Sequence, residues 1–245
     1  MRRIRIYHNG DLSSGLTVML DQSASHHLLQ VLRKKAGERF VMFNGQGGEF
    51  DAALTSANKK TACVEIGQWH ERKVESELSI HLGQAISRGE RMDYAIQKSV
   101  ELGVTEITPL LTEFCQVQLS ENRIDKRVAH WQAIAISAAE QSGRCAVPIV
   151  HPPILFSEWI LQKNHIKIIC CPRQVKSPDH FELLSQSKNI SLTIGAEGGF
   201  SDREINDALQ AQFITMSLGP RILRTETATV VALTLLQERL GDLAI

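Results

Sequence analysis

The stretch ISLTIGAEGGFSDREI, residues 190–205, decides how the second half of this chain folds. Over residues 190–194 apolar side chains alternate with smaller or polar ones, as they do in a strand. Ser201 and Glu204 then form the pattern of a capping box, which indicates that a helix begins after Ser201. The segment is therefore predicted to contain a strand, a glycine-rich loop and a helix.

Three glycines and one glutamate occupy five positions of this loop, residues 195–199. Glycine either allows backbone angles that other residues resist or lets another molecule approach the main chain closely. The order G-x-x-G-G differs from the G-x-G-x-x-G of dinucleotide-binding folds, and no Lys-Ser or Lys-Thr follows as in a phosphate loop. A tight turn explains the glycines as well as a ligand does, so the loop alone leaves both interpretations open.

Composition limits the class of protein. A chain of 245 residues that is 43% hydrophobic can form two domains or one large one. It contains no apolar stretch of about 18 residues, and residues 1–10 lack the apolar core of a signal peptide, so we expect a soluble, cytoplasmic protein. The five cysteines show no C-x-x-C spacing and the nine histidines no ligand spacing on a helix. We therefore expect reduced thiols and no metal.

The net charge of zero conceals an asymmetry between the two parts of the chain. Residues 1–73 carry 11 Lys and Arg against 7 Asp and Glu, whereas residues 74–245 carry 16 against 20. A small basic domain beside a mildly acidic one suggests that the first part meets a polyanion. Ordinary variation of a solvated surface is the alternative explanation.

Residues 1–73 are predicted to form a small β domain. Alternating or continuous apolar runs predict five strands, at residues 3–8, 17–21, 38–44, 48–56 and 61–69. Short strands at this spacing are typical of a small barrel. One helix interrupts them at residues 23–35, with Ser23 or Ser25 as its cap. The charged segment HERKVESE is expected to link this domain to the next.

Residues 74–245 alternate between strand and helix patterns. Strands are predicted at 78–86, 104–111, 166–171, 190–195 and 213–218, and helices at 91–103 and about 122–142. This alternation predicts a mostly parallel sheet with helices on both faces. Ligands of such sheets bind outside the carboxyl ends of the strands. The loops after Cys171, Ile194 and Leu218 are therefore the first places to look for a ligand.

A second loop and helix follow in SLGPRILRTETATVVALTLLQERLG, residues 217–241. Thr225 is the expected helix cap, and residues 228–236 are apolar on nearly all sides, which predicts a helix buried all round. Such a helix fits a core or a dimer interface. Neither use explains the three charged residues at its start: Arg221, Arg224 and Glu226.

The motifs IGAEGGFS and LGPRILRTETA together resemble the paired loops of the SPOUT class of methyltransferases. Within that class, the whole chain resembles the bacterial small-subunit ribosomal RNA uridine N3-methyltransferase family. The segments HHLLQVLR, SRGERMDYAIQKSVELGVTEITPL and AAEQSGR and the two loops occur in the order of that family. One departure is Ala196, where the family usually has proline.

The resemblance implies an α/β fold with a C-terminal trefoil-knotted SPOUT methyltransferase domain, residues 74–245, and a small N-terminal PUA-like β-barrel that binds RNA, residues 1–73. It implies S-adenosylmethionine-dependent methylation of N3 of a specific uridine in small-subunit ribosomal RNA, free or in the assembled subunit. It also implies a homodimer paired through the C-terminal domain, with no metal and no membrane. The alternatives are another RNA substrate, or a non-catalytic RNA-binding factor of ribosome assembly.

By that resemblance, two sets of residues belong to the active site. The residues expected to bind the cofactor are Gly195, Ala196, Glu197, Gly198, Gly199, Leu218, Gly219, Ile222, Leu223, Thr225, Thr227 and Ala228. The residues expected to act in catalysis are Arg221, Arg224 and Glu226. A structural ion pair between Arg224 and Glu226 is the alternative for that pair.

Basic residues elsewhere are the candidates for phosphate contacts. The residues expected to contact RNA are Arg2, Arg3, Arg5, His26, His27, Arg33, Lys34, Lys35, Arg88, Lys98 and Arg144. Each of them alone also has an ordinary structural explanation, such as a solvated surface charge or, for Lys98, a pair with Glu101 one helical turn away.

Overall fold

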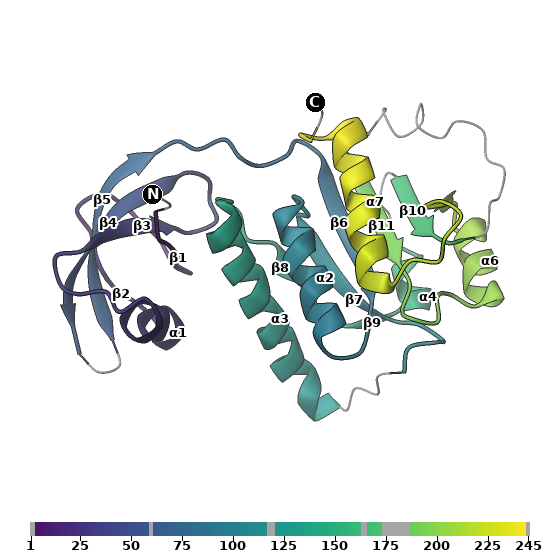
Figure 1. Ribbon diagram of the computed structural model, residues 1–245, viewed down its shortest axis with the longest axis horizontal. Helices are drawn as coiled ribbons and strands as arrows, with labels where there is room; N and C mark the ends of the chain where they lie inside the picture. Colours follow the sequence, from purple (N-terminus) through teal and green to yellow (C-terminus); the bar gives the residue numbers. More distant parts are fainter. Residues whose placement is uncertain (1–2, 59–60, 117–120, 163–165, 173–186, 244–245) are drawn as a thin grey trace. The chain divides into compact units, whose positions relative to one another are not determined.

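The computed structural model describes residues 3–58, 61–116, 121–162, 166–172 and 187–243, and the chain divides into two compact units (Figure 1). The first unit comprises Met1–Glu75 and Ala139–Val147, and the second comprises Ser76–Ala138 and Pro148–Ile245. The segment Ala139–Val147 thus belongs to the first unit, although the sequence pattern placed it with the second domain. Among the described residues, no helix is long and apolar enough to span a membrane.

The first unit contains a sheet of five strands in the order β1-β3-β4-β5-β2. The strands are β1 (Arg5–Tyr7), β2 (Thr17–Met19), β3 (Arg39–Phe43), β4 (Glu49–Ala57) and β5 (Ala62–His70). β1 pairs parallel to β3, and the other neighbours are antiparallel. The alternating segments therefore predicted all five strands correctly. β1 and β2 are the two ends of the recorded order, so closure into a barrel stays a prediction.

The helix of this unit differs from the prediction at both of its ends. α1 (Gln22–His26) is capped by Asp21, whose Oδ1 accepts a hydrogen bond from the Ala24 amide at 2.8 Å. Ser23 and Ser25, the two caps predicted from the sequence, lie inside the helix instead, and the buried Ser25 hydroxyl donates to the Leu20 carbonyl at 3.2 Å. The helix continues as a π-helical turn, η1 (His27–Val31), and ends at Val31. Residues 33–35 thus lie beyond the helix rather than in its last turn.

Two arginines that were expected to contact RNA are buried inside the first unit. Arg5 donates from Nε to Glu49 at 3.1 Å and from Nη1 to the carbonyl oxygens of Ala139 and Arg144 at 3.3 and 2.9 Å. Arg144 forms an ion pair with Glu75 at 2.7 Å, and only 7% of its side chain is exposed. These bonds attach the segment after Ala138 to the sheet. Both charges are thus used inside the unit, and contacts of Arg5 and Arg144 with RNA stay predictions.

The second unit contains a sheet in the order β12-β10-β11-β6-β7-β8, with β9 beside β7. Its strands are β6 (Ser79–Ala85), β7 (Glu106–Leu111), β8 (Ile149–Val150), β9 (Ile154–Leu155), β10 (Ile166–Cys170), β11 (Asn189–Ile194) and β12 (Ile214–Met216). Every recorded pair is parallel, as the alternation of strands and helices predicted. β8 and β9 were not predicted, because two residues are too short for a periodic signal.

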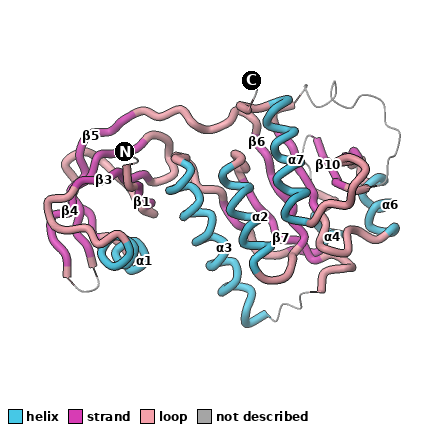
Figure 2. Tube along the Cα trace, in the orientation of Figure 1, coloured by secondary structure: helices cyan, strands magenta, loops and turns pink. Residues whose placement is uncertain are grey.

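Helices cover both faces of this sheet. They are α2 (Glu90–Glu101), α3 (Glu121–Ser142), α4 (Phe156–Trp159), α6 (Asp202–Gln210) and α7 (Thr225–Leu240). Figure 2 shows α2 and α7 side by side, and the two pack against each other. On β6 the Gln84 side chain bonds to Thr225 of α7, whereas a Cβ at Gly83 would meet Trp159 of α4 on the other face. The α/β class is confirmed, and the trefoil knot stays a prediction.

The helices that follow the glycine-rich loop and the second loop, residues 217–224, begin close to where the sequence placed them. Ser201 caps α6: its hydroxyl accepts from the Glu204 amide at 3.2 Å, and Glu204 accepts from the Ser201 amide at 2.9 Å. For α7 the cap is Arg224, and Thr225 is the first helical residue. Leu235 is 37% exposed, so α7 is not buried all round within one chain.

Candidate functional site

A buried network of hydrogen bonds fixes the start of α7 against β6 and β11. The Thr225 hydroxyl donates to the Gly195 carbonyl at 2.6 Å and accepts from Gln84 Nε2 at 3.0 Å. The Thr229 hydroxyl lies 2.6 Å from Gln84 Oε1, to which it donates. The side chains of Gln84 and Thr229 are fully buried. A satisfied polar network in the interior holds its members in one arrangement, so it fixes the second loop beside the first.

The glycines of the first loop have structural roles of their own. The loop closes as a turn in which the Gly199 amide donates to the Ala196 carbonyl at 2.9 Å, with φ of 70° at Gly199. A Cβ at Gly195 would lie 3.1 Å from the Gly199 backbone, and one at Gly198 would lie 2.8 Å from the Phe114 Cβ. The turn interpretation therefore holds for this loop. At Gly199 the space is open, since a Cβ would meet nothing within 4 Å.

Glu197 anchors the same loop to the start of α2. Its Oε1 accepts from the Arg88 amide at 3.1 Å and from Arg91 Nη1 at 3.0 Å. Burial by itself would raise the pKa of Glu197, but the hydrogen bonds from Arg88 and Arg91 outweigh it and lower the pKa below its ordinary value. The carboxyl group is therefore an anion at neutral pH, held between the loop and the helix.

The glycine-rich loop, residues 195–199, and the second loop, residues 217–224, line a cavity of about 350 Å³. It lies at the carboxyl ends of β10, β11 and β12, where the topology of an open parallel sheet places a ligand. Of the predicted site residues, it is lined by Gly195, Ala196, Glu197, Gly198, Gly199, Leu218, Gly219, Arg221, Ile222, Leu223, Thr225 and Ala228.

Three of the predicted residues do not line this cavity: Arg224, Glu226 and Thr227. Arg224 and Thr227 are exposed. In the part of the chain that the structure describes, no ion pair joins Arg224 to Glu226. One carboxylate oxygen of Glu226, Oε2, is buried there without a hydrogen-bond partner. The structural ion pair considered for these two residues is thus not formed.

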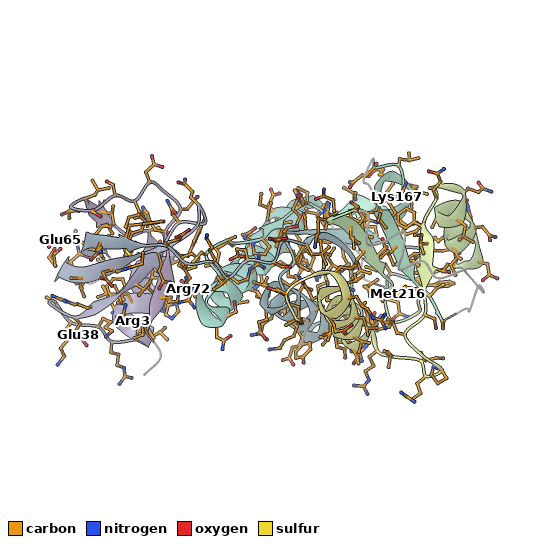
Figure 3. The ribbon with its side chains drawn as sticks, turned by 90° about the horizontal axis from the view of Figure 1, so that it is seen from above. Arg3, Glu38, Glu65, Arg72, Lys167 and Met216 are labelled. Carbon is orange, nitrogen blue, oxygen red and sulfur yellow. The ribbon has the colours of Figure 1, made fainter. Side chains whose placement is uncertain are left out.

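Sequence reasoning missed part of the lining. The additional residues are Cys170, Cys171, Pro172, Ile194, Phe200, Asp202, Ile205 and Met216. Met216, labelled in Figure 3, ends β12. Some of these residues could have been found from the sequence, because the predicted topology had already selected the loops after β10 and β11 as ligand-binding positions. Residue type gave no further help, since apolar residues at strand ends are equally typical of a core.

The remaining basic residues lie on the surfaces of their own units. Arg2 lies outside the described residues. Those that are exposed are Arg3, His26, Arg33, Lys35 and Arg88. His27 is half-buried, with Nδ1 3.7 Å from a Glu140 carboxylate oxygen. Lys34 and Lys98 form ion pairs with Glu38 and Glu101 at 3.1 and 2.8 Å, so the surface pair considered for Lys98 is present. Contacts of these residues with RNA stay predictions.

Comparisons with known proteins cover both units. Residues 74–237 match the RNA methyltransferase domain family, and residues 20–67 match the RNA methyltransferase PUA domain family. The chain is 39% identical to ribosomal RNA small subunit methyltransferase E of Buchnera aphidicola subsp. Schizaphis graminum, covering 98% of each chain. It is 34% identical to the Synechocystis protein of the same name, covering 89% of this chain and 71% of the relative.

A solved structure is similar over the whole chain. The crystal structure of ribosomal RNA small subunit methyltransferase E from Neisseria gonorrhoeae, bound to S-adenosylmethionine, superposes with a TM-score of 0.88. The two chains are 40% identical, and the match covers 99% of this chain and 100% of the other.

Proposed function

The chain belongs to the RNA methyltransferase family that includes ribosomal RNA small subunit methyltransferase E, and from this premise we propose that it transfers a methyl group from S-adenosylmethionine to N3 of a uridine in small-subunit ribosomal RNA. The observation that carries the proposal is the cavity between the two loops, which are joined by the hydrogen bond from Thr225 to the Gly195 carbonyl. This cavity lies at the carboxyl ends of the strands, where open parallel sheets bind their ligands.

The residues of the cavity fit S-adenosylmethionine. Its volume of about 350 Å³ is in the range of small-molecule sites. Ile194, Leu218 and Leu223 supply apolar surface for an adenine ring, and the open side of Gly199 leaves main-chain groups accessible. Asp202 also lines the cavity, and a carboxylate there would complement the positive charges of the cofactor.

Bound S-adenosylmethionine supplies a methyl group on a positively charged sulfur, and the residues of the chain position the acceptor and remove its proton. Uridine N3 carries a proton that must leave as the new N–C bond forms. We assign this proton to Glu226, because its buried Oε2 has no hydrogen-bond partner among the described residues. Arg221 and Arg224 at the same helix start would stabilise the negative charge of the uracil.

The first unit is proposed to bind the RNA through its PUA-like domain, whose strands are proposed to close into a barrel. Its excess of Lys and Arg over Asp and Glu favours a polyanion. We also propose a homodimer through the second unit, because the apolar helix α7 leaves Thr234 and Leu235 exposed within one chain. An enzyme with this substrate works in the cytoplasm.

Two measurements test the proposal. Titration calorimetry should detect S-adenosylmethionine binding by the full chain, and single-turnover reactions should methylate small-subunit ribosomal RNA, free or assembled, from a strain that lacks the modification. Mass spectrometry of the digested RNA should then identify N3-methyluridine. RNA binding without cofactor binding would instead support a non-catalytic assembly factor, and a methyl group on another RNA or another atom would overturn the assigned specificity.

A further inference from the structure

Three side chains that can ligate a metal meet on one face of the second sheet. His81 of β6 is the register partner of Glu106 on β7, so the two side chains stand next to each other. His151 directly follows β8, and its amide donates to the Ile107 carbonyl of β7 at 2.8 Å. One possible ligand atom of each residue lies within 4.8 Å of the other two.

The three side chains are already neighbours of one another. His151 Nε2 lies 2.8 Å from Glu106 Oε2, and the His81 and His151 rings are 5.5 Å apart. The Trp159 ring stands edge-on to His81 at 4.7 Å, and the Thr108 hydroxyl lies 2.8 Å from His81 Nε2. The group therefore has an apolar wall and a hydroxyl on one side. All three members remain partly exposed, so an ion can reach them.

Both histidines offer nitrogen ligands. A neutral imidazole has a lone pair on one nitrogen, which is the form in which histidine binds a metal.

We propose that His81, Glu106 and His151 bind a divalent transition-metal ion of the zinc type. Two imidazoles and one carboxylate are a donor set that Zn²⁺ accepts with a fourth position left to water, whereas Mg²⁺ and Ca²⁺ prefer oxygen ligands alone. Ligand atoms about 2.0 Å from a tetrahedral zinc ion are roughly 3.3 Å apart. A ligand separation of up to 4.8 Å must therefore shorten by about 1.5 Å, which side-chain rotation can supply.

The site is separate from the proposed methyl transfer. It lies at the first residue of β7 and the third of β6, whereas the cofactor cavity is lined by residues at and beyond the carboxyl ends of β10, β11 and β12. A bound ion would connect three neighbouring strands. Its expected effect is to stabilise the folded state, because an ion that binds only the folded chain raises the free energy of unfolding.

The test uses the full chain without an affinity tag, freed of metal with a chelator. The protein is titrated with Co²⁺, whose visible absorption reports tetrahedral coordination, and melted with and without Zn²⁺. The informative variants are His151→Gln and Glu106→Gln. His130→Gln is the matched control, because it breaks another exposed histidine–carboxylate pair, His130 to Asp93 at 2.9 Å, outside the group.

Wild type and His130→Gln should bind one equivalent of Co²⁺, and free Zn²⁺ at 100 times its Kd should raise their Tm by about 5–10 °C. Both ligand variants should bind Co²⁺ at least 10-fold more weakly and lose most of the Zn²⁺-dependent rise. Melting each variant without metal separates lost binding from lost stability. An unchanged Tm of the wild type in Zn²⁺, or equal Co²⁺ binding by wild type and His151→Gln, would overturn the proposal whether or not the chain is a methyltransferase.

Discussion

Replacing Thr225 with valine should loosen the start of α7 while leaving its packing almost unchanged. Valine has the same branched shape as threonine and lacks only the hydroxyl group, so the change removes two hydrogen bonds. The lost bonds are the one donated to the Gly195 carbonyl at 2.6 Å and the one accepted from Gln84 Nε2 at 3.0 Å. Gly195 belongs to the glycine-rich loop, and Gln84 lies on β6 beside the place where the two loops meet.

The loss of these hydrogen bonds affects the two partners differently, and the two costs together determine the change in the free energy of unfolding. Gln84 Nε2 keeps its bond to the Ala85 carbonyl at 3.2 Å, so its loss is that of one bond, about 1 kcal/mol. The Gly195 carbonyl oxygen loses the hydrogen bond that the Thr225 hydroxyl donates to it, and leaving a buried polar group unsatisfied costs about 1–3 kcal/mol. We therefore expect the free energy of unfolding to fall by about 2–4 kcal/mol.

A matched control lies outside the proposed dimer interface. Thr55 of β4 is exposed, and its hydroxyl donates to the Cys63 carbonyl at 3.0 Å. Thr55→Val should change the free energy of unfolding by no more than about 0.5 kcal/mol. Urea unfolding followed by circular dichroism measures both variants, and calorimetry should find weaker S-adenosylmethionine binding only for Thr225→Val. Equal stability of the two variants would refute the argument that this network holds the loops together.

Three further predictions concern pH-dependent stability, the rate of methylation and RNA binding. The pKa of Glu197 is lowered in the folded protein, so the charged carboxylate stabilises the fold. This contribution to the free energy of unfolding should be complete above the ordinary glutamate pKa of about 4.5 and be lost as the pH falls through the lower pKa of the folded protein. In a series of unfolding measurements at different pH, Glu197→Gln should lack this loss. Glu226→Gln should slow single-turnover methylation by about 100-fold or more while RNA binding is retained. Neutralising Arg33, Lys34 and Lys35 together should reduce the salt dependence of RNA binding by up to about 2 in the log–log slope, with cofactor affinity unchanged.

The strands and helices could be predicted because their signals are local. Alternation over residues 189–194 and the capping box of Ser201 with Glu204 depend only on neighbouring residues, and the structure agrees with both. The cap of α1 could not be chosen in this way, because several residues before that helix are suitable caps. Asp21 has the role since Ser25 is buried and bonded to the Leu20 carbonyl.

The glycines of residues 195–199 were recognised correctly as a motif, but their spacing does not separate a turn from a ligand site. A Cβ at Gly198 would meet Phe114, a residue 84 positions earlier whose nearness no spacing could have indicated. Loss of cofactor binding in Gly198→Val would therefore not distinguish ligand contact from packing. The family itself was predicted from the two loops together and is confirmed by the match of residues 74–237.

Contacts between distant segments of the chain limited what the sequence could predict, and the same limit bears on the proposed metal site. Arg5 was expected on the surface, yet its guanidinium bonds to carbonyl oxygens more than 130 residues away in the chain. In a parallel sheet, neighbouring strands come from distant segments, so side chains such as His81 and His151 can meet without any spacing in the sequence. The expectation of no metal was based on spacing alone. Spacing can reveal only metal sites whose ligands lie on one helix or one short loop. A site built across three strands has to be sought in the structure.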